Sequence, residues 1–454
     1  MAPKILIANR GEIALRVVRA CRELGIASVV VYSEADRDSL AVQLADEAVC
    51  IGPAPAVESY LKIDRIIAAA ELVGATAIHP GYGFMSENAH FAEICEKCNL
   101  TFIGPSPAAI RAMGNKTAAR ERMKAAGVPV TPGSDGSVRE ISEAIRWASE
   151  VGYPVLLKAS AGGGGKGMRL VLKESDMINN FYAAQHEAEQ TFSSGELYLE
   201  KYLANPRHVE VQIIADRHGN VVQLGERDCS LQRRHQKLIE ESPCPVLDDE
   251  TRRAMGAAAV AAAQSVQYSS VGTIEFLLDE DGSFYFMEMN TRIQVEHPVT
   301  EMVTGIDLVQ EQIRVGLGER LSFTQEDVTM RGHAIEVRIN AEDAKRNFAP
   351  CPGKVEFFLA PGGPGVRLDS HLYSGYRVPS HYDSLLGKLI VWAPDRQQAI
   401  TRCRRALQEL MVVGVPTTAA FADELLATEA FRDGRYATKF VENYIAQGGE
   451  SLPL

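Results

Sequence analysis

The feature that most constrains the fold is an alternation of short strand patterns with helix patterns, which begins at Lys4. The first helix pattern, Gly11–Leu24, follows the first strand directly and ends at a glycine. The strand patterns are Lys4–Ala8, Ser28–Tyr32, Ala77–His79 and Thr101–Ile103. Strands that are joined by helices form a parallel sheet with helices on both faces. Residues 1–113 are therefore predicted to form one doubly wound α/β domain.

The length of 454 residues suffices for about three domains. The rest of the chain is predicted to form further α/β and α+β regions. Residues 114–203 are predicted to form a small lid around a glycine run. Residues 207–321 are strands joined by tight turns, with one alanine-rich helix. The last region begins with a strand and ends with helices. The expected elements are a helix at Ser142–Glu150, strands at Pro154–Lys158 and Met168–Leu172, a helix at Asp249–Val266, a strand at His333–Asn340 and a helix at Arg396–Leu410.

Charge and composition exclude several classes of protein. The net charge of −12 repels a nucleic-acid backbone, so we expect no nucleic-acid partner. The longest apolar stretch, Ala254–Ala263, is far shorter than the roughly 20 residues of a membrane span, and no signal peptide is expected. The eight cysteines are scattered, with one isolated C-x-x-C pair. We expect reduced thiols and a cytoplasmic protein without a membrane partner.

The glycine run at residues 161–167 formally satisfies the dinucleotide pattern G-x-G-x-x-G, but that match is spurious. A dinucleotide-binding loop leads from a strand into a helix, whereas strand patterns flank this run on both sides. The run is instead predicted to be the tip of a hairpin. Its amides and the adjacent Lys158 and Lys166 could close over a phosphate. The alternative is a flexible surface hairpin without a ligand.

The segment from Thr273 to Asn290 predicts a metal site. Asp281-Gly282 is typical of a two-residue type I′ turn, and such a turn would place Glu275 opposite Glu288. Two facing carboxylates repel each other unless a cation lies between them. Hard oxygen ligands favour Mg²⁺ or Mn²⁺, shared with nucleotide phosphates. A register shifted by one residue would separate the acids and remove the site.

Downstream of the hairpin, polar residues continue on alternate positions. If the backbone stays extended, one face carries Glu288, Asn290, Arg292, Gln294 and Glu296. These groups could supply metal ligands, an anion clamp and a general base, although a solvated strand face would look similar.

Two basic features are ambiguous by themselves. In the strand His333–Asn340, Arg338 shares a face with Glu336 and could be only its salt-bridge partner. The cluster Arg233–Lys237 could be a nuclear signal or an RNA contact, but the acidic chain favours a local anion site.

Four separated segments resemble the biotin carboxylase family of ATP-grasp enzymes, and the resemblance covers nearly the whole chain. They are Ile7-Ala-Asn-Arg-Gly-Glu-Ile-Ala-Leu15, His79-Pro-Gly-Tyr-Gly-Phe84, Arg227-Asp-Cys-Ser-Leu-Gln-Arg-Arg-His-Gln-Lys237 and Met287-Glu-Met-Asn-Thr-Arg-Ile-Gln-Val-Glu-His-Pro298. The resemblance implies an ATP-grasp fold with a pre-ATP-grasp domain over residues 1–113, an ATP-grasp region over 114–328 with a mobile lid at about 131–203, and a C-terminal biotin carboxylase domain over 329–454.

The same resemblance implies the site residues. ATP would be bound by Lys116, Lys158, Gly164, Gly165, Glu200, Lys201, Tyr202, Leu203, His208, His235, Glu275 and Glu288. Mg²⁺ or Mn²⁺ would be held by Glu275, Glu288 and Asn290. Bicarbonate would be bound by Lys237, Arg292, Gln294, Val295 and Glu296, and biotin by Tyr82, Gly83 and Arg338. The catalytic residues would be Glu296 as the base, with Arg292, Lys237 and Arg338.

The implied activity is ATP- and bicarbonate-dependent carboxylation of biotin by way of carboxyphosphate, the first half-reaction of acetyl-CoA carboxylase in fatty acid synthesis. No Ala-Met-Lys-Met biotinylation motif occurs, so biotin would reside on a separate carrier protein. Carboxyltransferase subunits and a second copy of the chain are the other implied partners, the latter through the helix that carries Arg19 and Glu23.

Other functions remain open at this stage. Similar subunits serve pyruvate, propionyl-CoA and 2-oxoglutarate carboxylases. Another ATP-grasp ligase would keep the metal hairpin but would need neither Arg338 nor bicarbonate. A non-catalytic scaffold protein would need none of the catalytic groups.

Overall fold

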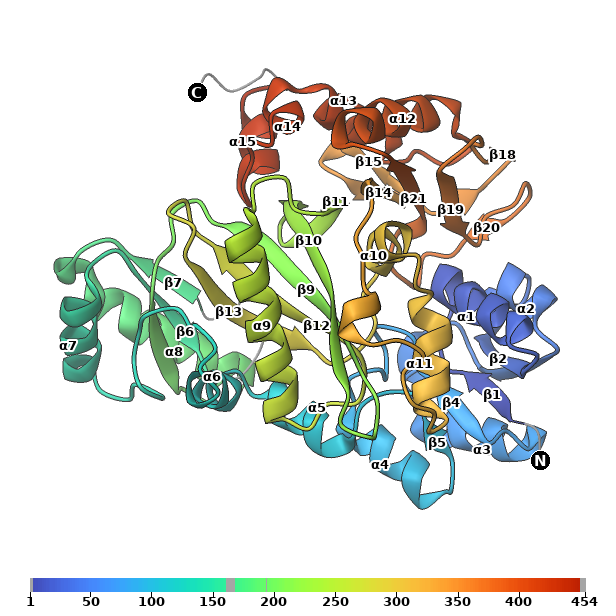
Figure 1. The fold of residues 1–454 in the computed structure, drawn as a ribbon, viewed down its shortest axis with the longest axis horizontal. Coiled ribbons are helices and arrows are strands. Elements are labelled where there is room, and N and C mark those ends of the chain that lie inside the picture. Colours follow the sequence, from blue (N-terminus) through green and yellow to red (C-terminus); the bar gives the residue numbers. More distant parts are fainter. Residues whose placement is uncertain (1–2, 161–167, 193, 450–454) are drawn as a thin grey trace.

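The computed structural model describes residues 3–160, 168–192 and 194–449. Gly164 and Gly165, and with them Lys166, lie outside the described residues. No described helix combines the length and hydropathy that a bilayer-spanning segment requires. A central antiparallel sheet is flanked by the N-terminal domain, the lid and the C-terminal helices (Figure 1).

The N-terminal domain contains a five-stranded parallel sheet in the order β3-β2-β1-β4-β5. Its strands are β1 Lys4–Ile7, β2 Ala27–Ser33, β3 Glu47–Gly52, β4 Ala77–His79 and β5 Thr101–Phe102. Its helices are α1 Gly11–Glu23, α2 Leu40–Leu44, α3 Ile63–Val73 and α4 Ala89–Lys97. Ile5 and Ile7 face one apolar core, and Leu6 faces another on the opposite side. The predicted doubly wound domain is confirmed.

The strand order of this domain reverses between β1 and β4, so the loops after these two strands face one crevice. The loop after β1 leads into α1, and the loop after β4 carries Tyr82 and Gly83. Asn9 Nδ2 donates hydrogen bonds to the carbonyl oxygens of Pro80 and Tyr82, both at 2.7 Å. These bonds hold the second loop against the first.

The central sheet has eight antiparallel strands in the order β13-β12-β9-β10-β11-β14-β21-β19. Its strands are β9 Arg207–Ala215, β10 Val221–Arg233, β11 Gln236–Ser242, β12 Ser270–Leu278, β13 Phe284–Asn290, β14 His333–Asn340, β19 Val366–Ser370 and β21 Leu385–Ala393. Because β14 pairs with β11, the sheet is continuous between the second and third regions of the sequence.

The two faces of this sheet differ in chemistry because side chains alternate along each strand. One face packs against the helices α9 Asp249–Ser265 and α12 Arg396–Glu409 through apolar side chains such as Val211 and Val337. The other face, which we call the active face, carries charged side chains and is partly covered by α10 His297–Thr304 and α11 Leu308–Gly316.

The lid is a separate layer with its own apolar core. Its three-stranded sheet consists of β6 Val155–Ala159, β7 Met168–Val171 and β8 Leu197–Lys201, and its helices are α7 Ile141–Val151 and α8 Met177–Phe192. Strands β6 and β7 pair antiparallel, as expected for strands on either side of a hairpin tip. The lid extends to the side of the central sheet (Figure 1).

Further elements complete the fold. The helices are α5 Pro107–Gly114, α6 Lys116–Ala125, α13 Ala419–Ala427, α14 Glu429–Arg432 and α15 Phe440–Ala446. The short strands are β15 Glu342–Asp343, β16 Ala349–Pro350, β17 Gly353–Lys354, β18 Phe357–Leu359, β20 Arg377–Val378 and β22 Met411–Val413.

The hairpin β12–β13 corrects one sequence prediction. The predicted two-residue turn is wrong, because Asp279 N–H donates to the carbonyl oxygen of Ser283 at 2.8 Å and three residues lie between them. The last of these, Gly282, has φ of +84°, which suits the left-handed position of a three-residue loop. A bulge after Glu275 then shifts the register by one residue, so Glu275 still pairs with Glu288.

Candidate functional site

A row of charged side chains crosses the active face. Glu275 pairs with Glu288 on one side and with Glu210 on the other, and Glu210 pairs with Arg227. Directly opposed residues of an antiparallel pair project from the same face. The predicted juxtaposition of the two hairpin acids is therefore confirmed, although a bulge and a longer loop produce it.

Glu275 lies at the centre of a set of hydrogen-bond donors. Its Oε1 accepts from Asn290 Nδ2 at 2.8 Å, Gln294 Nε2 at 2.9 Å and Lys237 Nζ at 3.0 Å, and its Oε2 lies 3.0 Å from His208 Nε2. Burial alone would raise the pKa of Glu275, but Lys237 and His208 lower it well below its ordinary value. Glu275 is therefore ionised and available as a ligand.

The oxygen atoms near the hairpin fit a hard divalent cation, with one condition. Glu275 is buried, whereas Glu288 is 39% exposed, with its Oε2 only 3.4 Å from Lys116 Nζ. Asn290 directs its amide nitrogen toward Glu275, and its Oδ1 accepts from Arg292 Nη2 at 2.9 Å. An ion bound by Asn290 would need this amide turned over, because Mg²⁺ and Mn²⁺ take oxygen ligands.

Lys237 links the hairpin to the middle of the sheet. Its Nζ contacts three carboxylates, at 2.6 Å from Glu210, 3.0 Å from Glu275 and 2.6 Å from Glu296. Burial lowers the pKa of Lys237, but the acidic groups around it, Cys229 first among them, raise it well above its ordinary value. A lysine held in this way stays protonated and offers a fixed positive charge.

Glu296 is fully buried between two cations. Its Oε1 accepts from Lys237, and its Oε2 accepts from Arg338 Nη2 at 2.9 Å. Burial would raise the pKa of Glu296, but Lys237 and Arg338 hold it well below its ordinary value. The group is a carboxylate at neutral pH and can act as a general base.

One interpretation of the sequence, that Arg338 is only the salt-bridge partner of Glu336, does not hold in the structure. The bonds that Arg338 makes are Nε to Glu240 Oε1 at 2.6 Å and Nη2 to Glu296. Glu240 lies opposite Glu336 on the adjacent strand. Sequence reasoning missed Glu240 because it is 98 residues away from Arg338 in the chain.

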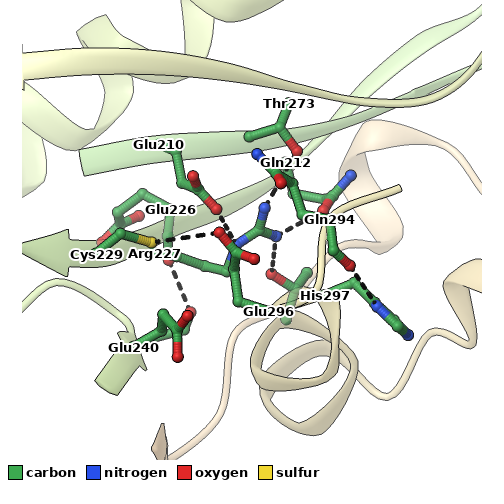
Figure 2. A network of polar contacts seen from close by, with 12 residues as sticks. Glu210, Gln212, Glu226, Arg227, Cys229, Glu240, Thr273, Gln294, Glu296 and His297 are labelled. Atoms are coloured by element: carbon green, nitrogen blue, oxygen red, sulfur yellow. Dashed lines mark hydrogen bonds and ion pairs between the residues drawn. The ribbon is translucent and has the colours of Figure 1, made fainter. Parts of the chain in front are cut away.

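Arg227 organises the centre of the face (Figure 2). Its fully buried guanidinium donates to Glu210 at 2.6 Å, to Gln212 at 2.6 Å and to the hydroxyls of Thr273 and Thr300 at 3.1 and 3.0 Å. The sequence contained Arg227 in a motif but did not predict this role or that of Glu210.

The segment after β13 corrects a second prediction. The strand ends at Asn290, and Glu296 is the N-cap residue of α10, so the backbone does not stay extended. The polar groups converge through a loop instead. Arg292 Nη1 donates to Gln294 Oε1 at 2.8 Å, and its Nε donates to Glu87 Oε2 at 2.9 Å. The sequence did not identify Glu87.

The basic cluster Arg233–Lys237 does not form one anion site. Arg234 and His235 are the exposed residues of a tight turn, and both have positive φ. Arg233 stacks on Phe348 at 4.2 Å and donates to Asn347. Lys237 alone of the five projects into the charged row, because the turn separates it from the others.

The remaining predicted nucleotide residues belong to the lid sheet or directly follow its strand β8. Lys158 of β6 forms an ion pair with Glu200 of β8, which also lies 3.4 Å from Arg120. Lys201 Nζ donates to the carbonyl oxygen of Gly152 at 2.8 Å. Tyr202 and Leu203 follow β8 and are half-buried.

Two of the three predicted biotin residues, Tyr82 and Gly83, line a small cavity next to the crevice of the N-terminal domain. Its volume is about 110 Å³, and it is lined by Asn9, Arg10, Gly11, Glu12, Tyr82, Gly83, Phe84, Asp383 and Leu385. Arg338 is not part of this lining. Burial and the adjacent Glu12 raise the pKa of the Tyr82 hydroxyl well above its ordinary value, and Arg338 opposes this rise only in part.

Comparisons with known proteins agree over the whole length of the chain. Residues 1–110 match the family described as biotin carboxylase, N-terminal domain, and residues 336–443 match the biotin carboxylase C-terminal domain. Residues 115–324 match the ATP binding domain of the carbamoyl-phosphate synthase L chain.

Matches to individual proteins also cover nearly the whole chain. The chain is 59% identical over 439 residues to the biotin carboxylase of Nostoc sp., and the match covers 97% of this chain and 98% of the relative. It is 57% identical to the biotin carboxylase of Pseudomonas aeruginosa, covering 97% and 98%. The biotin carboxylase domain dimer of the Hydrogenobacter thermophilus 2-oxoglutarate carboxylase, in complex with MgADP, ADP and bicarbonate, matches with a TM-score of 0.92 and 50% identity over 100% of both chains.

Proposed function

The chain belongs to the biotin carboxylase family, and from that premise we propose that it uses ATP and bicarbonate to carboxylate biotin on a separate carrier protein. The observation that carries this proposal is the buried group formed by Lys237, Glu296 and Arg338. It joins a carboxylate of low pKa to two cations on the face that also holds the opposed hairpin acids.

The first step needs a base and fixed positive charge. Bicarbonate is a weak nucleophile, so we assign Glu296 to remove its proton while Lys237 and Arg292 neutralise the charge that grows on the carbonate. Gln294 and the Val295 backbone complete the proposed bicarbonate site. Attack on the γ-phosphorus of ATP then gives carboxyphosphate and ADP.

The nucleotide is assigned to the edge of the sheet near the lid. Lys116, Lys158 and His208 would contact ATP, together with Gly164, Gly165, Glu200, Lys201, Tyr202, Leu203 and His235. Glu275, Glu288 and Asn290 would hold Mg²⁺ or Mn²⁺, which supplies charge neutralisation on the phosphates when bound. We call Lys116, Glu275, Glu288 and Asn290 the nucleotide end of the active face.

The second step takes place at the other end of the charged row. Carboxyphosphate breaks into CO₂ and phosphate, and the phosphate removes the proton of the biotin ureido nitrogen. Arg338 stabilises the negative charge that develops on the ureido oxygen, and the nitrogen attacks CO₂. Tyr82 and Gly83 would hold the biotin ring. We call Lys237, Glu240, Glu296 and Arg338 the carboxylation end.

We also propose the division of the chain at residues 113/114 and 328/329, with the lid over about 131–203. The N-terminal part, the lid and the C-terminal part each have one apolar core whose buried residues all lie within that part, which supports this division. A cytoplasmic location is supported by the eight free cysteines.

A homodimer is supported by an exposed apolar patch on the two-stranded sheet β18–β22. Phe357 pairs with Val413 and Leu359 with Met411, and each of these side chains is 42–47% exposed. A patch of this kind on one face of a sheet is suited to a protein contact. Phe357→Ser should lower the molar mass measured by light scattering from dimer to monomer, and an unchanged mass would argue against this surface.

The final acyl acceptor belongs to carboxyltransferase subunits, the third class of proposed partner. Acetyl-CoA is our first candidate, because relatives such as the Nostoc protein carry the name biotin carboxylase alone. Pyruvate, propionyl-CoA and 2-oxoglutarate are alternatives. Relatives from a pyruvate carboxylase and a 2-oxoglutarate carboxylase favour two of them.

The test is an ATP hydrolysis assay with the purified chain. We expect slow release of phosphate that requires bicarbonate and increases on addition of free biotin. Turnover without bicarbonate would point to another ATP-grasp ligase, and absence of turnover with intact nucleotide binding would point to a scaffold protein.

A further inference from the structure

The motif Ile7–Leu15 contains an acid that the proposed mechanism does not use. Glu12 lies in the first turn of α1, directly after β1, and is 4% exposed. Its Oε1 accepts a hydrogen bond from the Tyr82 hydroxyl. Its Oε2 is buried and makes no hydrogen bond to any described residue. Glu12 therefore touches the loop to which we assign biotin.

A lysine from the opposite end of the chain approaches the same acid. Lys388 lies in β21 and is fully buried, with 0% of its surface exposed. Its Nζ lies 3.2 Å from Glu12 Oε1 and donates a hydrogen bond to the carbonyl oxygen of Val295 at 2.7 Å. Lys388 thus contacts both the N-terminal domain and the segment to which we assign bicarbonate.

Burying the charges of Lys388 and Glu12 costs free energy unless opposite charges and hydrogen bonds compensate for the lost hydration. A buried ammonium loses its hydration and must be compensated by carboxylates and carbonyl oxygens. The strand register places Arg338 and Asp369 on either side of Lys388. Burial raises the pKa of Glu12, and the nearby charge of Lys388 opposes that rise. Removing the charge of Lys388 would leave the buried Glu12 carboxylate without a cationic partner among the described residues.

We propose that Lys388 and Glu12 are a pair of positioning residues that align the bicarbonate-binding segment with the biotin loop. Lys388 fixes the Val295 carbonyl, and Glu12 fixes the Tyr82 hydroxyl, so one ion pair sets the distance between the two substrates. The inference rests on the proposed function. Alignment matters because a misplacement of about 1 Å can reduce a rate about 100-fold.

The test uses Lys388→Met, which keeps the length of the side chain and removes its charge. In the full chain, we expect the KM for bicarbonate and the KM for free biotin each to rise about tenfold or more, since a hydrogen bond from a charged group is lost. The KM for ATP should change less than twofold. Unchanged values for bicarbonate and biotin in folded Lys388→Met protein would overturn the inference.

Arg396→Met is the matched control. Arg396 of α12 also compensates a buried carboxylate, Glu241 of β11, but on the other face of the sheet. The Arg396→Met variant should have a lower thermal stability than the wild type. Its KM values for bicarbonate, free biotin and ATP should stay within twofold of the wild-type values. If Arg396→Met raised the same two KM values as Lys388→Met, the effect would be one of general stability and the positioning role would be wrong.

The double variant Glu12→Gln/Lys388→Met covers the case in which Lys388→Met does not fold. It removes both buried charges together, which costs less stability than leaving one of them unpaired. Its KM values for bicarbonate and biotin should remain raised, and normal values would refute the inference. Failure of the proposed function is distinguishable, because the wild-type chain would then show no bicarbonate-dependent ATP hydrolysis.

Discussion

At the nucleotide end of the active face, Lys116 and Glu288 each keep more than a third of the side chain in solvent, at 36% and 39%. At the carboxylation end, Lys237 and Glu296 are exposed by only 12% and 0%. Lys116 and Glu288 can therefore exchange a metal and a charged substrate with water, whereas Glu275 and Asn290 at the same end are buried. The carboxylation end excludes water from groups that must handle a reactive intermediate.

The two ends also differ in how the chain builds them. Glu275 and Glu288 face each other across one hairpin, so a short stretch of sequence suffices to bring them together. The carboxylation end combines residues from β11, from the start of α10 and from β14. Charges at this end should therefore be more strongly coupled, and substitutions there should have larger effects.

The largest effect is expected for Glu296→Gln at the carboxylation end. The amide keeps the shape but cannot accept the bicarbonate proton, so bicarbonate-dependent ATP hydrolysis should fall at least about 100-fold. Nucleotide affinity, measured by calorimetry, should stay within about threefold of the wild-type value. The exposed Glu319→Gln serves as a control. A collapse of ATP affinity instead would mean that Glu296 belongs to the nucleotide end.

A smaller effect is expected for Arg338→Lys. An ammonium cannot bridge Glu240 and Glu296 as the guanidinium does, so the biotin-stimulated rate at saturating ATP and bicarbonate should fall about tenfold. Arg377→Lys, at an exposed position, should leave this rate unchanged. A variant with full biotin stimulation would show that charge alone suffices at this position.

Glu288→Gln tests the nucleotide end. Loss of one of two opposed carboxylates should raise the Mg²⁺ concentration needed for half-maximal ATP hydrolysis about tenfold, because the amide is a weaker ligand. Glu280→Gln in the loop of the same hairpin is the matched control and should behave like the wild type. An unchanged magnesium dependence in Glu288→Gln contradicts the proposed metal site.

The smallest effect concerns pH and stability at the carboxylation end. Burial raises the pKa of Glu240 from 4.5 to about 7, although Arg338 opposes this rise. A carboxyl group whose pKa is raised in the folded state stabilises the fold at pH values below the pKa of the unfolded state. For Glu240 this stabilisation is lost as the pH rises through about 7. The thermal midpoint should thus fall by a few degrees between about pH 5.5 and 8, and less so in Glu240→Gln.

Glu241, the next residue of β11, provides a control of opposite sign. Burial would raise its pKa, but His333 and Arg396 on the other face of the sheet lower it to about 2. The contribution of Glu241 to the stability of the fold is present above 4.5, the pKa of the group in the unfolded chain. This contribution is lost only as the pH falls toward 2. Glu241→Gln should lower the midpoint equally at both pH values. An equal pH slope in the wild type and in Glu240→Gln would show that Glu240 is already ionised.

Part of the site was predictable from local patterns. The opposed hairpin acids and the polar face of β14 followed from the two-residue period of strands, which needs no knowledge of the fold. The turn type was wrong because Asp-Gly fits two kinds of loop, and only the bulge after Glu275 restored the register. The extended run to Glu296 was wrong because α10 begins there, and its packing against β14 and β21 overrides the alternation.

The sequence by itself determined the class of the protein, the parallel N-terminal sheet and the identity of the polar residues, because these depend on local periodicity and on motifs. Only the tertiary structure decided which charges compensate one another. Glu240 meets Arg338, and Glu12 meets Lys388, across 98 and 376 residues of chain. Long-range pairs of this kind leave no local pattern, since they are selected by the free energy of burying charges together rather than by spacing along the chain.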